Sequence, residues 1–135
     1  MAHEHIVYMM LVDAAARAGD EAAIRKFAPK LEELALRDKH KPYLAVAHRA
    51  WGVAYRLAGE YAEAEERLKA GLKIFEDIGT QWQAARTLFE MGELALIKGE
   101  KEVAQENFSH AQELFEQLGA RPDITRTEAM LTQMT

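Results

Sequence analysis

An internal repeat, with a period of about 40 residues, constrains the fold of this chain more than any other feature. Gly19, Gly59 and Gly99 are evenly spaced, and an acidic residue follows each of them. When residues 43–80 are laid over residues 83–120, nine of the 38 positions are identical, and most of these are glycine, alanine or glutamate. Self-similarity at a fixed period marks repeat architectures, so the chain is predicted to stack copies of one small supersecondary unit.

Each copy is predicted to be a pair of helices, because apolar residues recur at intervals of three and four, as in Leu68, Leu72 and Phe75. No window alternates with the period of two that a half-buried strand requires. A glycine after most helical runs suits a left-handed helix cap. The predicted helices cover residues 4–18, 20–37, 42–58, 61–77, 81–98, 101–118 and 122–133.

Pro29 conflicts with the second of these helices. Proline has no backbone N–H, and its ring clashes with the preceding turn, at a cost of about 3 kcal/mol in a helix interior. We therefore expect a kink or break near Phe27 and Ala28.

The composition indicates one globular domain over residues 1–135. Hydrophobic residues make up 49% of the chain and there are only three prolines. The net charge of -5 argues against a nucleic-acid surface, and the absence of cysteine excludes disulfides and thiolate sites. No apolar run approaches the roughly 18 residues that span a bilayer, and no basic leader opens the chain. A cytoplasmic protein with neither membrane nor nucleic-acid partner is expected.

The polar residues form no recognisable catalytic or metal-binding pattern. His3 and His5 stand two positions apart and so point to different faces of a helix, and Val7 occupies the position where a zinc-protease motif has its second histidine. The acidic run at residues 60–66 precedes Arg67 and Lys69, which is typical of a solvated helix face. We expect no enzyme activity, no catalytic residue, no metal and no cofactor.

The repeat pattern resembles the tetratricopeptide repeat family, in which small residues let two helices pack closely. Its order of large residue, glycine, aromatic, glycine, aromatic, alanine and large residue is carried by Trp51, Gly52, Tyr55, Gly59, Tyr61, Ala64 and Leu68. The period in this chain is longer than the standard repeat, which has roughly 34 residues. The endings "KIFEDIGT" and "ELFEQLGARPDITRTEAML" look like the longer version found in large bacterial signalling and transcription regulators.

This resemblance implies an all-α fold, a right-handed stack of three helix-turn-helix hairpins. The hairpins are expected over about residues 3–40, 43–80 and 83–120, with a seventh, capping helix over about residues 122–133. The positions that hold the repeat together are expected to be Trp51, Gly52, Tyr55, Gly59, Ala64, Gly92, Gly99 and Ala104.

The resemblance also implies a non-catalytic protein-protein interaction module that is part of, or an adaptor to, a bacterial signalling system. A self-association module that forms a homo-oligomer is the alternative. In the first case the first helix of each hairpin lines a concave groove for a partner helix or peptide. The expected groove residues are Ile6, Met9, Asp13, Arg17, Val46, Arg49, Val53, Arg56, Arg86, Phe89, Glu93 and Leu96.

These groove residues form one row on the first helix of each hairpin. They include four arginines and only two acidic residues, which predicts a locally positive groove and an acidic partner. Two alternatives stay open. Some of the apolar members can fill the space between hairpins, and the arginines can form ordinary salt bridges with acids on neighbouring helices.

Overall fold

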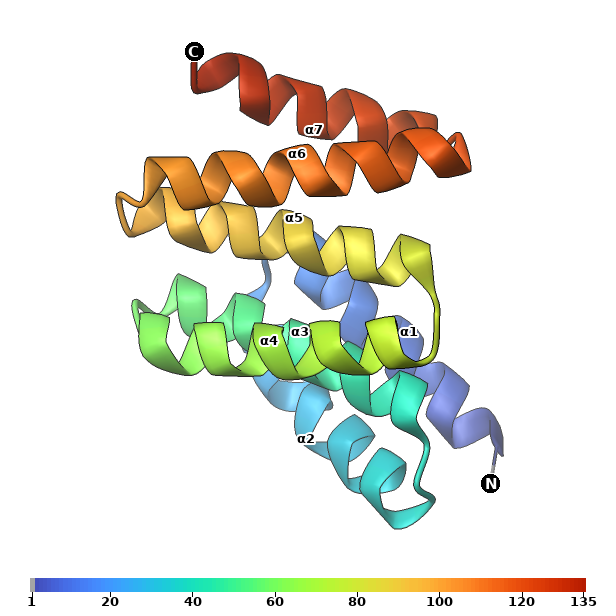
Figure 1. The fold of residues 1–135 in the computed structure, drawn as a ribbon. Coiled ribbons are helices and arrows are strands. Elements are labelled where there is room, and N and C mark those ends of the chain that lie inside the picture. Colours follow the sequence, from blue (N-terminus) through green and yellow to red (C-terminus); the bar gives the residue numbers. More distant parts are fainter. Residues whose placement is uncertain (1) are drawn as a thin grey trace. The chain divides into compact units, whose positions relative to one another are not determined.

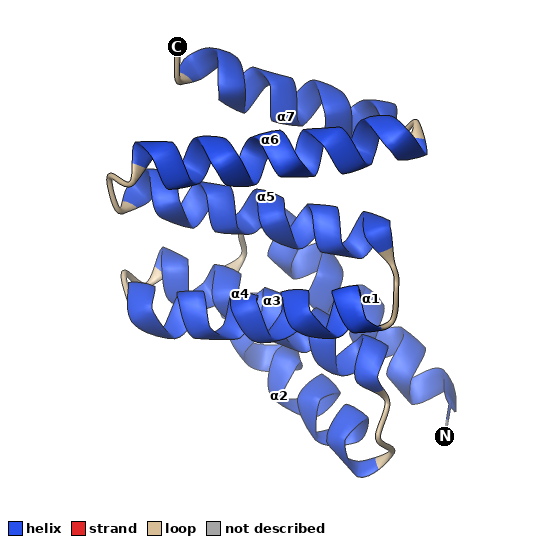
Figure 2. Ribbon diagram, in the orientation of Figure 1, coloured by secondary structure: helices blue, strands red, loops and turns tan. Residues whose placement is uncertain are grey.

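The computed structural model of the chain describes residues 2–135, with side chains described from residue 4 onward. This part of the chain is entirely helical and contains no strand (Figures 1 and 2). Its seven helices are α1 (Ala2–Ala18), α2 (Glu21–Arg37), α3 (Lys41–Leu57), α4 (Tyr61–Asp77), α5 (Gln81–Ile97), α6 (Lys101–Leu118) and α7 (Arg121–Gln133). The prediction of an all-α fold with seven helices is confirmed.

The helices fall into two compact units, one reaching to Ile78 and the other covering Gly79–Thr135. In the first unit α2 packs against α1 and α3, α1 also contacts α3, and α3 pairs with α4. In the second unit α6 packs between α5 and α7. Tight turns join α1 to α2, α3 to α4 and α5 to α6, as expected for hairpins. The single domain, the three hairpin boundaries and the capping role of α7 stay predictions.

In two of the helix pairs, α3 with α4 and α5 with α6, a glycine of the first helix lies against a large side chain of the second. A Cβ atom on Gly52 of α3 would lie 2.5 Å from two side-chain atoms of Leu68 in α4. A Cβ on Gly92 of α5 would lie 2.7 to 2.9 Å from ring atoms of Phe108 in α6. Leu68 and Phe108 occupy equivalent positions of successive repeats, and both are fully buried. The same small-against-large contact therefore holds both hairpins together.

The turn between α2 and α3 differs from the other turns. Lys39 adopts a left-handed backbone conformation with φ 53°, and it is the only non-glycine residue at positive φ in the part of the chain described. Gly79 and Gly119 occupy the corresponding positions of the next two repeats. A side chain in this conformation costs roughly 1 kcal/mol, so this turn carries local strain. The corresponding turns of the next two repeats avoid the strain because they have glycine at this position.

The same turn is tied to α1 through a charged cluster. Arg37 donates two hydrogen bonds to the carboxylate of Asp38, at 2.9 and 2.8 Å. These bonds, more than any other contact, lower the pKa of Asp38 to about 2. Nε2 of His5 in α1 lies 2.8 Å from the Oδ2 atom of the same carboxylate, at ion-pair distance. Asp38 thus connects the first helix to the end of the second.

The expected break at Pro29 is absent, because α2 runs without interruption from Glu21 to Arg37. The helix buries Ile24, Leu31 and Leu34 completely, and each such side chain contributes roughly 1.5 to 3 kcal/mol on burial. Pro29 itself is exposed. Burial on one face outweighs the cost of the proline. A bend at this position stays a prediction.

Candidate functional site

The row predicted on α1 is accessible. Ile6 and Arg17 are exposed, and Met9 and Asp13 are half-buried. Spacings of three and four residues place these four side chains along one side of the helix. This helix therefore exposes two of its four predicted residues to solvent.

The row predicted on α3 mainly fills the interior. Val46, Arg49 and Val53 are buried, and Arg56 is half-buried. The alternative that apolar members of the rows fill space between helices thus describes the two valines.

The row predicted on α5 is mixed. Phe89 is buried, with its ring edge against Phe108 at 5.2 Å and the guanidinium of Arg126 above it at 4.1 Å. Arg86, Glu93 and Leu96 are half-buried. The guanidinium of Arg86 lies over the ring of Trp82 at 4.8 Å, and Glu93 lies 4.0 Å from Arg126. Charged members of this row are engaged with neighbours of their own unit.

Arg49 is placed differently from the prediction. Its side chain is 2% exposed, it pairs with Oδ1 of Asp13 at 3.1 Å, and its guanidinium lies 5.1 Å from the centre of the Phe75 ring. A buried guanidinium needs a compensating carboxylate, because an isolated charge costs several kcal/mol to desolvate. This placement corrects the expectation that Arg49 adds positive charge to an accessible groove.

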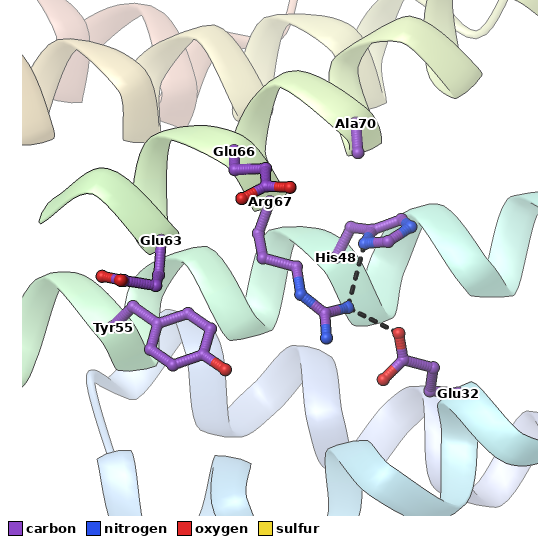
Figure 3. Close-up of a pocket in the computed structure, with 7 residues that line it drawn as sticks. All are labelled: Glu32, His48, Tyr55, Glu63, Glu66, Arg67 and Ala70. Carbon is purple, nitrogen blue, oxygen red and sulfur yellow. Dashed lines mark hydrogen bonds and ion pairs between the residues drawn. The ribbon is translucent and has the colours of Figure 1, made fainter. Parts of the chain in front are cut away.

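A pocket of about 400 Å³ lies in the first unit, between α2 and α4 and over α3 (Figure 3). Helix α2 contributes one lining residue, α3 two and α4 four. The lining residues are Glu32, His48, Tyr55, Glu63, Glu66, Arg67 and Ala70.

Arg67 organises one side of this pocket. Its Nη1 atom forms an ion pair with Glu32 and also donates a hydrogen bond to Nδ1 of His48, over 3.1 Å. Burial lowers the pKa of His48 below its ordinary value, and the charge of Arg67 lowers it further, while Glu32 opposes the shift. His48 is therefore neutral at pH 7, which suits an acceptor facing a guanidinium. Arg67 and Glu32 cancel each other's charge.

The other side of the pocket is aromatic and acidic. The rings of Tyr55 and Trp51 stack at 5.5 Å, and the guanidiniums of Arg25 and Arg67 lie 5.8 and 5.7 Å from the Trp51 ring. The indole nitrogen of Trp51 is buried with no hydrogen-bond partner. Figure 3 shows Glu63 beside Tyr55, on the side of the pocket away from His48.

The sequence alone did not single out this pocket. The spacing of Glu63 and Glu66 places them on one side of a helix, and His48 and Tyr55 stand two helical turns apart on another. Both signals are visible, but each also describes an ordinary solvated face. Glu32 comes from a third helix, and no local pattern places it opposite Arg67.

Among the residues whose side chains are described, no group of three or more histidine, aspartate or glutamate residues could hold a metal ion. The side chain of His3 lies outside that part. No helix in the part of the chain that the structure covers is long and apolar enough to cross a membrane.

The family model described as "Tetratricopeptide repeat" matches residues 43–117. That stretch runs from the first turn of α3 almost to the end of α6, and it includes both glycine contacts. No curated protein is a significant match to the chain.

Proposed function

Because the chain belongs to the tetratricopeptide repeat family, whose repeats generally mediate protein-protein interaction, we propose that it is a non-catalytic module that binds a helix or extended peptide of a partner protein. The matched residues 43–117 cover more than half of the 135-residue chain. Recognition of a helix or peptide by an apolar surface is a recurring binding mode of helical proteins.

The observation that carries this proposal is the exposed apolar surface of α1. Ile6, Val7, Met10 and Leu11 are 46%, 52%, 61% and 40% exposed. They occupy neighbouring positions over two helical turns, so they form one continuous strip and not scattered side chains. Contiguous exposed apolar surface on a soluble protein marks an interaction site.

The finer parts of the proposal rest on the predicted rows. We propose that Ile6, Met9, Asp13 and Arg17 contact the partner, together with the half-buried Arg56, Arg86, Glu93 and Leu96. With Arg49 internal, the preference for an acidic partner rests on Arg17, which is exposed on the same helix as the apolar strip. A role in a cytoplasmic bacterial signalling or regulatory system is supported by the resemblance of the helix endings.

Self-association is the second candidate, and the same apolar strip favours it. A strip of this kind on one chain can bury itself against the strip of a second copy, because apolar burial is not directional. A partner protein and a second copy would compete for one surface.

The apolar strip can be interrupted without touching the core by the double substitution Val7→Gln/Met10→Gln, which replaces its two most exposed residues. Leu36→Gln, at an equally exposed apolar position of α2, serves as the control. Partners captured on the immobilised chain are identified by mass spectrometry, and their binding to the variants is then measured. Binding that is lost in the double variant and kept in the control supports the proposal. Unchanged binding by the double variant refutes it.

Light scattering over a range of concentrations separates the two candidates. A mass that stays monomeric up to high micromolar concentration rules out self-association. A mass that rises with concentration, and falls back to the monomer in the double variant, establishes self-association instead.

A further inference from the structure

We propose that the outer face of α1 packs against the same face of a second copy of the chain, with the two helices antiparallel. In this dimer Val7 of each copy lies opposite Ala14 of the other. The inference deepens the self-association candidate, on which it rests, because it names the helix, the direction and the register of the contact.

The outer face of α1 is defined by four exposed residues, which follow one side of the helix at spacings of three and four. They are Val7, Met10, Leu11 and Ala14. Among the described residues of the first unit, α1 packs against two helices, α2 and α3, whereas α3 packs against three. The repeat places Ala47, Ala50 and Ala54 of α3 at the positions of residues 7, 10 and 14, and all three are fully buried. The side of the helix that α3 buries is therefore the side that α1 leaves open.

The residues on this face are not those of a surface built to face water. A helix at the open side of a stack needs polar residues there. Helix α7 has mostly polar residues at its exposed positions, which are Arg121, Pro122, Thr125, Arg126, Glu128, Ala129, Thr132 and Gln133. On α1, by contrast, Val7 is 52% and Met10 61% exposed. Covering these side chains with another apolar surface removes them from water, which favours association.

The charges at the two ends of the outer face favour a second copy as the covering helix. Exposed Glu4 lies at the amino-terminal end of this face, and exposed Arg17 lies at its carboxyl-terminal end. Antiparallel pairing brings the acidic end of each copy beside the basic end of the other, whereas parallel pairing would bring like charges together. Both residues also interact within their own chain. Exposed ion pairs add little affinity, so these charges set the direction of the contact more than its strength.

One register matches the side-chain sizes and the end charges together. When Val7 lies opposite Ala14 of the second copy, the two-fold symmetry brings Met10 level with Leu11 of that copy. A larger side chain then meets a small one twice, so the helices can approach to the roughly 8 to 10 Å that is typical of packed helices. Glu4 comes level with Arg17 in the same register, because each lies three positions beyond the valine or the alanine.

The contact is small, which sets its strength and its role. Specific, stable interfaces involve roughly 20 to 30 residues on each side, which is more than one helix face provides. The dimer is therefore weak and becomes populated only at high micromolar concentration. It covers three of the four residues of the apolar strip, so a chain in the dimer cannot present the strip to a partner protein.

Disulfide trapping tests the register, because the chain has no cysteine of its own. The variants Val7→Cys and Ala14→Cys are mixed at high micromolar concentration under mild oxidation. Mass spectrometry separates the three possible dimers, since the two variants differ in mass. Residues that face each other across packed helices have Cα atoms within the roughly 7 Å that a disulfide can span. The mixed dimer is expected to form at least about fivefold faster than a dimer of either variant alone.

The control for trapping is Leu36→Cys mixed with Ala14→Cys. Leu36 is 60% exposed, but it lies on α2 and not on the outer face of α1. This pair is expected to show no excess of the mixed dimer over the dimers of one variant.

Reversing one charge tests the direction. Arg17→Glu places an acid beside Glu4 of the second copy and is expected to weaken association about threefold at low salt, as measured by light scattering. The double variant Glu4→Lys/Arg17→Glu restores opposite charges and should recover the original association. Arg121→Glu is the matched control, because it makes the same change at an exposed position of α7 and should leave association unchanged.

Three results would overturn the inference. A protein that stays monomeric at high micromolar concentration would leave the outer face to a partner protein. A mass that rises without an excess of the mixed disulfide would place self-association on another surface, so the self-association candidate would survive while this inference fails. Faster formation of the dimers of a single variant, or stronger association of Arg17→Glu, would assign a parallel pairing.

Discussion

Replacing Gly52 with alanine tests whether the approach of α3 to α4 is as close as the structure shows. The new Cβ atom would lie 2.5 Å from both Cγ and Cδ2 of Leu68, which is fully buried and cannot turn into solvent. Overpacking of this kind costs about 1 to 3 kcal/mol. Alanine recovers about 1 kcal/mol through its better helix propensity. The net loss is therefore up to about 2 kcal/mol, whereas the same change in an open helix would stabilise it.

A double-mutant cycle isolates the steric part of this loss. Leu68→Ala removes Cγ and both Cδ atoms and should cost about 2 to 5 kcal/mol by itself. In the double variant the methyl group of Ala at position 52 enters the vacated space. The double variant should therefore lose at least about 1 kcal/mol less than the sum of the two single variants. Urea unfolding followed by far-UV circular dichroism measures all four proteins.

A contact as close as this one would be contradicted by additivity of the two substitutions within about 0.5 kcal/mol, or by a stabilisation of about 1 kcal/mol from Gly52→Ala alone. The second hairpin repeats the experiment. A Cβ on Gly92 would lie 2.7 to 2.9 Å from ring atoms of Phe108, so the cycle of Gly92→Ala with Phe108→Ala should show coupling of the same sign.

Four further outcomes are expected. Lys39→Gly should stabilise the protein by about 0.5 to 1 kcal/mol in thermal melts, because glycine relieves the left-handed strain; a lower midpoint would contradict this. Asp13→Asn should cost about 3 kcal/mol in urea unfolding, because it removes the carboxylate that faces the buried Arg49; a loss below about 1 kcal/mol would show that the pair is not needed. The lowered pKa of His48 means that the unfolded chain binds a proton more readily than the folded one. The stability linked to His48 is thus complete above the ordinary pKa of this group, near 6.5, and falls as the pH drops below that value. His48→Gln should therefore flatten the loss of stability between about pH 7 and pH 5.5. An unchanged slope in the variant would argue against a lowered pKa of His48. Deleting residues 122–135 should expose the apolar side of α6 and promote aggregation, whereas a truncated protein that stays equally soluble would remove the capping role from α7.

Local patterns in the sequence were enough to predict the helices and their pairing. Apolar spacing and turn glycines act within one or two helical turns, so they can be read without knowing any neighbour. The repeat also identified Gly52 and Gly92, because a small residue that recurs opposite a recurring large one indicates a close contact. At Pro29 the local rule predicted a kink or a break; α2 runs through this position without a break, and a bend there stays a prediction.

Which of the predicted groove residues are accessible depends on how distant helices pack, and local patterns do not show this. Helical spacing placed Arg49 on the same side as Val46 and Val53, but it could not show that Asp13 of α1 meets this guanidinium in the interior. The pocket also depends on residues that are distant in the sequence, since Glu32 and Arg67, which form an ion pair, are 35 positions apart. A periodic pattern records which side chains share a face of one helix. Which neighbouring helix covers that face depends on packing between distant segments, and that packing decides whether a charge is paired, buried or left for a partner.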